Sequence, residues 1–266
     1  MANRLRAWLV PERDQVVVTD PVQRKAIIVE LVIVFTVTLG MNGLRSLLSL
    51  IDALLKPAPL SDQKVAINVP QAVDTTIDLI KQLLSATQLV AWGALGLYLV
   101  WRAGHKLTEV GLKFFRSDMV RGVGLAALIG IPGLGLYLIV YALGGNLAVQ
   151  TTTLDDTWWR PIALVASAAG NAWAEETLVI AYFITRLRQL GLHENQSVAC
   201  SAVLRGSYHL YQGFGGFVGN LVMGLVFGRI WQRTNRLWPM IIAHTLLDTV
   251  AFVGYSLLRG VSWLPK

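Results

Sequence analysis

Residues 174–183, Ala-Glu-Glu-Thr-Leu-Val-Ile-Ala-Tyr-Phe, place two adjacent carboxylates inside a largely apolar run. The apolar segment around them, 159–184, is long enough to cross a lipid bilayer, which takes about 20 helical residues. An acidic side chain at membrane depth costs about 2.5–3.5 kcal/mol on insertion scales. Glu175 and Glu176 therefore need partners that offset this cost, and we predict that they lie in a polar pocket within the protein.

The composition is that of an integral membrane protein. Of the 266 residues, 54% are hydrophobic and only 15% are charged, and the mean hydropathy is +0.54. Soluble domains carry about 25% charged residues, so we predict an all-α, polytopic membrane helical bundle. We expect the net charge of +7 to orient the protein in the membrane and to contact anionic lipids. It does not indicate nucleic-acid binding.

Seven apolar segments predict about seven or eight transmembrane helices. They cover residues 26–48, 80–101, 123–143, 159–184, 197–211, 217–231 and 238–257. An eighth span arises if Gly-Ile-Pro-Gly at 130–133 breaks the third segment. Residues 107–115 are predicted to form a short amphipathic helix at the membrane surface, and 56–75 a polar loop.

The distribution of Lys and Arg predicts the orientation in the membrane. Both residues gather near the N-terminus, in 102–121 and in 229–236, whereas the loop 144–157 contains neither. The excess of positive charge on cytoplasmic loops then places the N-terminus in the cytoplasm.

This pattern also predicts the domain organisation. We expect residues 1–25 to form a cytoplasmic N-terminal arm and residues 26–266 to form a single transmembrane bundle. The protein is expected to be integral to a membrane, the plasma membrane if the source is bacterial.

Four polar side chains in the later apolar segments are candidate partners of the glutamate pair: Arg205, His209, His244 and Asp248. Arg205 and His209 are four residues apart, as are His244 and Asp248, so each pair is predicted to share one face of its helix. We predict that these side chains and the two glutamates meet in one water-filled pocket inside the membrane.

These residue types permit hydrolysis of an amide. A carboxylate beside an imidazole can hold a water molecule and take its proton, and a second imidazole with a polar neighbour can stabilise an oxyanion. Glu175, His209 and His244 could instead bind Zn²⁺, although no His-Glu-x-x-His segment supports a metal site. Both a metal-dependent and a metal-free site are therefore compatible with the sequence.

The motifs resemble the CAAX-protease and bacteriocin-processing family (CPBP, also called Abi), which is related to the type II CAAX prenyl endopeptidases. That family has a Glu-Glu pair followed by Arg in one helix, an aromatic residue four before a His in a second, and His-xxx-Asn/Asp in a last helix. Glu175-Glu176, His209 and His244-xxx-Asp248 fit this pattern in order and spacing. The resemblance covers a core at about residues 160–255.

The resemblance implies an intramembrane peptidase in which the Glu-Glu pair, both histidines and the aspartate are catalytic. Glu175 would be the general base that acts with His209 on a water molecule, and His244 with Asp248 would form the oxyanion site. The enzyme would be a metalloprotease, with zinc on Glu175, His209 and His244, or a metal-independent glutamate protease. Its partner would be a membrane-associated peptide or protein substrate.

Two positions depart from the family pattern. Ile180 stands where the family has Arg, five residues after the first Glu, and Arg205 stands where it has an aromatic residue. We hypothesise that the cation has moved to the neighbouring helix, so that Arg205 pairs with Glu176. The motivation is that an uncompensated buried acid is costly.

Two non-enzymatic interpretations use the same polar pocket. The first is a membrane transporter, although such proteins often contain internal repeats and none is visible in this sequence. The second is a bacteriocin-immunity or scaffolding protein that acts by binding.

Overall fold

The computed structural model describes residues 17–257, and its long elements are all helices, which confirms the predicted all-α bundle. The helices are α2 Pro21–Val37, α3 Leu39–Leu55, α4 Thr75–Arg102, α5 Ser117–Ala142, α6 Arg160–Glu175, α7 Thr185–Gln189, α8 Glu194–Ser207, α9 Phe214–Thr234 and α10 Trp238–Leu257. Two short strands accompany them, β1 Lys64–Asn68 and β2 Ala148–Thr152. The predicted N-terminal arm falls mostly outside the described residues, and α2 begins at Pro21, before the predicted end of the arm.

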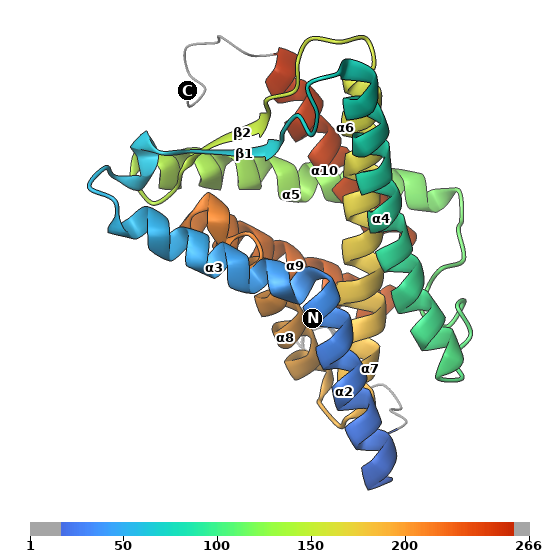
Figure 1. Cartoon of the computed structure of the whole chain (residues 1–266). Helices are drawn as coiled ribbons and strands as arrows, with labels where there is room; N and C mark the ends of the chain where they lie inside the picture. The colour runs from blue at the N-terminus through green and yellow to red at the C-terminus, as the bar shows by residue number, and fades with distance from the viewer. Residues whose placement is uncertain (1–16, 258–266) are drawn as a thin grey trace.

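Helix α6 lies at the centre of the bundle, where it packs between α4 and α10. Helix α8 packs along α9, and both α9 and α10 contact α5. In Figure 1, α4 and α6 run side by side on the right, whereas α3 and α9 extend to the left. The helix that carries the glutamate pair is thus covered by neighbours on both sides.

The glutamate pair lies where α6 changes its winding. The 16 residues of α6 continue directly into a π-helical segment of 9 residues, Glu176–Ile184, and then into the 5 residues of α7. Such wide turns are rare and occur frequently at functional sites. Tyr182 Oη within this segment and Arg186 Nε just after it donate to Glu30 Oε1 at 2.9 and 2.8 Å, and these hydrogen bonds connect the helix to α2.

The polar loop predicted at 56–75 contains strand β1. Its partner β2 runs parallel to it, with Lys64 beside Ala148 and Asn68 beside Thr152. This sheet was not predicted, because each strand has only five residues and the two strands are far apart along the chain. In Figure 1 the strands lie above α3.

Fewer helices qualify as membrane spans than the seven or eight that we predicted. Among the described residues, α4, α5, α9 and α10 are long and apolar enough, and a fifth span is formed if α2 and α3 count together. The predicted span at 26–48 is divided by a 55° bend between these two helices. A Cβ on Gly40 would lie 2.7 Å from the Phe35 carbonyl oxygen, so glycine permits this bend. The fifth predicted span is the 14-residue α8, which is too short to cross a bilayer.

The alternative of a split at Pro132 does not occur, and one further local prediction was wrong. Pro132 lies inside α5, which continues past it, so the third apolar segment is not split. Residues 107–115 form turns rather than a surface helix. Gly111 has a φ of +87°, which interrupts a right-handed helix, and its carbonyl accepts from the Leu237 N–H at 3.0 Å.

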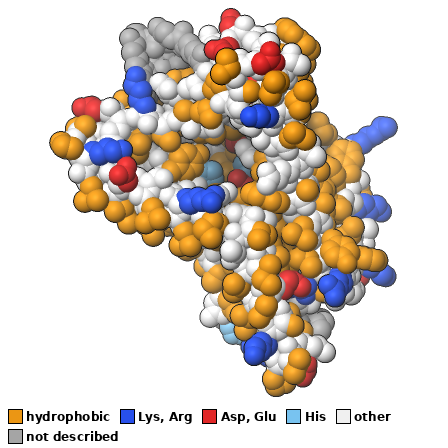
Figure 2. Space-filling view, in the orientation of Figure 1, with side chains coloured by type: hydrophobic (Ala, Val, Ile, Leu, Met, Phe, Trp, Pro, Cys, Tyr) orange, Lys and Arg blue, Asp and Glu red, His pale blue; other side chains and the backbone are white. Residues whose placement is uncertain are grey.

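Apolar side chains cover much of the outer surface (Figure 2). Three apolar residues of α5 are more than half exposed: Leu128, Ile131 and Ile139. In the most apolar stretch of this helix, only 6% of the residues are buried. A large contiguous apolar surface marks contact with a partner or a membrane. Together with the spanning helices, it makes this an integral membrane protein.

Close approach of α8 and α9 at Gly224 gives a first prediction. A Cβ at this glycine would lie 2.9 Å from Ala202 Cα and 3.3 Å from Arg205 Cδ. Gly224→Val should therefore destabilise the protein by about 1–3 kcal/mol through overpacking, measured as a lower thermal unfolding temperature in detergent. Gly219→Val on the same helix is the control, because its nearest atom, on Leu136, is 3.9 Å away. Equal unfolding temperatures for the two variants would contradict this packing.

Candidate active site

Arg205 joins both glutamates from the neighbouring helix α8. Its Nη2 lies 3.2 Å from Glu175 Oε2 and also bonds Glu176 Oε1, while its Nη1 lies 3.4 Å from Glu176 Oε2. Arg205 and Glu176 are fully buried. The cation that we hypothesised as the partner of Glu176 thus contacts both acids.

The surroundings of Arg205 suit a buried cation. Its Cζ lies 5.5 Å from the ring centre of Phe227 on α9, within the range of a cation–π contact. Taking charged groups out of water is costly unless good geometry compensates them. The glutamates, the aromatic ring and the small residue at Gly224 together provide that geometry.

His244 of α10 completes the cluster. Its Nδ1 lies 2.8 Å from Glu176 Oε1 and 3.3 Å from Arg205 Nη2, and its Nε2 lies 3.6 Å from Asp248 Oδ2. Nδ1 therefore lies between an acceptor, the Glu176 carboxylate, and a donor, the Arg205 guanidinium, and the tautomer of the ring decides which of the two it bonds. Three carboxylates therefore surround two groups that can carry positive charge.

The two glutamates differ in their access to solvent. The Glu175 side chain is 10% exposed, whereas that of Glu176 is 0% exposed. Tyr208 Oη donates to Glu175 Oε2 at 2.8 Å. Glu175 can thus meet a molecule from outside the cluster, while Glu176 is confined to its contacts with Arg205 and His244.

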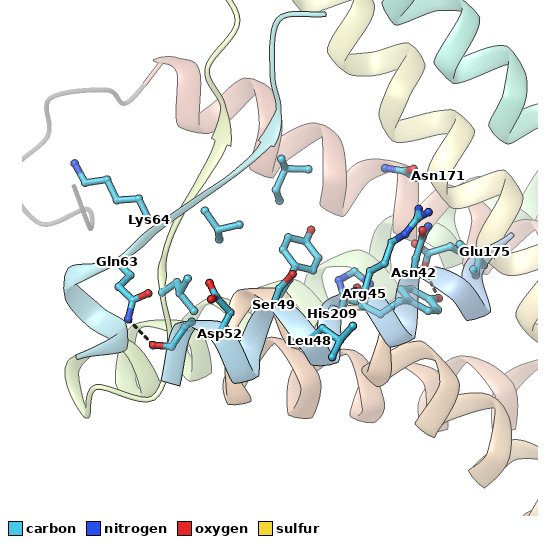
Figure 3. A pocket seen from close by; sticks show the side chains of 18 of the residues that line it. Asn42, Arg45, Leu48, Ser49, Asp52, Gln63, Lys64, Asn171, Glu175 and His209 are labelled. Atoms are coloured by element: carbon cyan, nitrogen blue, oxygen red, sulfur yellow. Dashed lines mark hydrogen bonds between the residues drawn. The ribbon is translucent and has the colours of Figure 1, made fainter. Parts of the chain in front are cut away.

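A cavity of about 780 Å³ lies beside Glu175 (Figure 3). Residues of α3, β1, α4 and α6 line it. Asn171 and His209 lie toward its Glu175 end in Figure 3, and Tyr208, which also lines the cavity, bonds Glu175. Figure 2 shows a hollow on this face of the molecule, with acidic and histidine side chains visible in it. The volume falls in the range of roughly 300–1,000 Å³ that is typical of ligand sites.

His209 lines this cavity, but it does not share a helix face with Arg205 as we predicted. Helix α8 ends at Ser207, and a tight turn of 3₁₀ helix, Leu210–Gln212, follows it, so His209 lies between two elements. Its Nδ1 is 3.5 Å from Gln212 Nε2. Its Nε2 is buried and has no hydrogen-bond partner within the described chain, which leaves this atom available to a bound molecule.

Sequence analysis missed several residues around the site. Asn171 precedes Glu175 by four residues in an apolar helix, a spacing that puts both on one face and could have identified it. Tyr208 directly follows the end of α8 and bonds Glu175 through its hydroxyl. Arg45 and Asn42 of α3 line the cavity, and their role depends on a tertiary contact that no spacing in the sequence indicates.

A comparison with family models identifies the C-terminal part of the chain. Residues 157–250 match the family described as type II CAAX prenyl endopeptidase Rce1-like. The chain carries an Rce1-like segment. It reaches from just before α6 into α10 and so includes the whole cluster of Arg205, Glu175, Glu176, His244 and Asp248. This match confirms the resemblance to CAAX proteases. Comparisons with curated proteins and with solved structures give no match.

The Rce1-like segment does not present the arrangement that a zinc ion requires. Across residues 17–257, no group of three His, Cys, Asp or Glu side chains is placed to hold a metal. Arg205 stands between the carboxylates, and His244 Nδ1 is engaged with Glu176. The ligands expected for a metal ion are Glu175, His209 and His244. In this arrangement they do not fit a zinc ion.

Removal of the central cation gives a second prediction. Arg205→Met leaves two buried acids of the Rce1-like segment without their cation, which should destabilise the protein by about 3–5 kcal/mol. Thermal unfolding in detergent measures the loss. Arg45→Met serves as the control, because Arg45 is exposed and forms no ion pair within the described chain. An equal effect of both substitutions would show that the cluster does not depend on Arg205.

Proposed function

We propose that this protein hydrolyses a peptide bond in a membrane-associated substrate, with Glu175 as the general base. The Rce1-like segment and the apolar helices support a CAAX-type intramembrane peptidase in general. One observation supports the individual roles most strongly. Only Glu175 of the two acids lines the cavity, while Glu176 is held by Arg205 and His244.

The proposed reaction begins with a water molecule held by Glu175 and by Nε2 of His209. Glu175 takes a proton from this water, and the resulting hydroxide adds to the carbonyl carbon of the scissile bond. The proton then passes from Glu175 to the amide nitrogen as the carbon–nitrogen bond breaks, which regenerates the carboxylate. Tyr208 holds the Glu175 carboxylate in place through its hydroxyl.

His244 is proposed to stabilise the oxyanion. Its Nε2 lies 3.6 Å from Asp248 Oδ2, and we propose that this long contact is exchanged for one to the substrate oxygen. A donor aimed at developing charge in a dry site can contribute strongly to the rate. Glu176 and Asp248 contact the ring from its two nitrogens and keep it oriented.

The position of Arg205 favours a glutamate protease over a metalloprotease. The guanidinium occupies the space between the carboxylates, so water activation falls to Glu175 and His209. The family description makes a peptide with a prenylated CAAX-type end the first substrate to test.

The catalytic roles give a third prediction. Glu175→Gln and His209→Ala should each reduce hydrolysis by about 100-fold to 10,000-fold, the usual contribution of general acid–base groups. The measurement is cleavage of fluorogenic peptides, with and without a prenylated cysteine, by purified protein in detergent. Both variants should retain the wild-type unfolding temperature to within a few degrees.

Glu109→Gln is the matched control, because Glu109 lies in the loop after α4 and its side chain is 52% exposed. This variant should cleave as fast as the wild type. The proposal fails if the wild type cleaves neither peptide, or if Glu175→Gln keeps its activity. Solute uptake into liposomes without any hydrolysis would instead favour the transporter.

A further inference from the structure

Strand β1 has a free edge. The Ala148 N–H donates to the Gln63 carbonyl at 2.9 Å, and the register places Val65 beside Val149. Since successive residues of a strand direct their peptide groups to opposite sides, the N–H and C=O of Lys64 and Ala66 face away from β2. No other hydrogen bond within the described chain reaches these groups.

This strand borders the candidate active-site cavity. Lys64, Val65 and Ile67 line it, whereas no residue of β2 does. Figure 3 shows Lys64 at one end of the cavity and Glu175 with His209 at the other. The β1 strand therefore runs along a wall that leads toward the proposed catalytic residues.

The far end of β1 is fixed to the helix that carries Glu175. Ser167 Oγ donates to Asn68 Oδ1 at 3.2 Å. Ser167, Asn171 and Glu175 follow one another at intervals of four residues on α6 and so share a face. At 1.5 Å per residue, about 12 Å of helix separates the end of β1 from Glu175, a distance that an extended peptide of four residues spans.

The fixed charges of the cavity indicate the occupant. Lys56 is paired with Asp52 at 2.9 Å, but Arg45 and Lys64 form no ion pair within the described chain. Val65 and Ile67 add apolar side chains to the same wall. The cavity thus suits an extended peptide that carries aliphatic side chains and a carboxylate.

We propose that β1 is a docking strand for the substrate, whose backbone pairs with the free edge at Lys64 and Ala66. Addition of a strand to a sheet edge is a common mode of peptide recognition, in which backbone hydrogen bonds supply affinity. The inference rests on the proposed peptidase function. It adds that the part of the chain before the Rce1-like segment holds the substrate in the extended form that brings its scissile bond to Glu175.

Ala66→Pro tests the docking strand, because proline removes the N–H on the free edge and is tolerated on edge strands. The KM for the fluorogenic peptide should rise about threefold to tenfold, the effect of one hydrogen bond, with kcat nearly unchanged. Val73→Pro is the matched control, because it makes the same change at a fully exposed loop residue that does not line the cavity, and it should behave as the wild type. An Ala66→Pro protein with the KM of Val73→Pro would overturn the proposal.

A second arm alters the substrate and leaves the protein intact. Peptides with a single N-methyl group at successive positions should lose affinity for the wild type at alternate positions, as pairing along one strand edge requires. In Ala66→Pro, N-methylation at one of these positions should cost less, because the two changes remove partners of one contact. Uniform tolerance of N-methylation would overturn the proposal.

Binding separates this inference from the peptidase function. A fluorescein-labelled octapeptide of aliphatic residues with a free carboxyl end is titrated into Glu175→Gln protein, with and without Ala66→Pro, and followed by anisotropy. Weaker binding with Ala66→Pro supports docking even if hydrolysis is never observed. Equal binding by the two proteins, or no binding by either, contradicts docking. The peptidase function would still hold in that case if Glu175→Gln abolishes cleavage and Ala66→Pro does not.

Discussion

The ion pairs between Arg205 and the two glutamates are the interaction on which the rest of the structure depends. They join α8 to the centre of the bundle at a point where neither acid could remain buried and charged alone. His244 extends the same cluster to α10. One cation thus holds three helices together and leaves Glu175 as the acid that lines the cavity.

The two halves of the chain contribute different parts of the candidate site around this cluster. Helices α6 to α10 supply the charged and imidazole groups, and this is the part that matches the Rce1-like family. Helix α3 and strand β1, which precede the match, supply the opposite wall of the cavity. Since a hydrolytic site needs both chemistry and a place for the substrate, the earlier half is expected to determine which peptides are accepted.

Much of the site could be predicted from the sequence because polar residues in apolar segments need one another. Five residues could be identified for this reason, and the structure brings them together: Glu175, Glu176, Arg205, His244 and Asp248. The number of spans, the turn at His209 and the contact of Tyr208 could not be predicted. They depend on where helices bend, end or widen, and tertiary packing decides this. The pairing of β1 with β2 could not be predicted either, because the strands are short and far apart in the sequence.

A double-substitution cycle on Arg205 and Glu176 tests the central claim most directly. Thermal stability would be compared in detergent for the wild type, Arg205→Met, Glu176→Gln and the double variant. If the cation is retained to neutralise buried carboxylates, the double variant will be more stable than Arg205→Met, with a coupling of about 1–3 kcal/mol. Destabilisations that simply add would contradict the account.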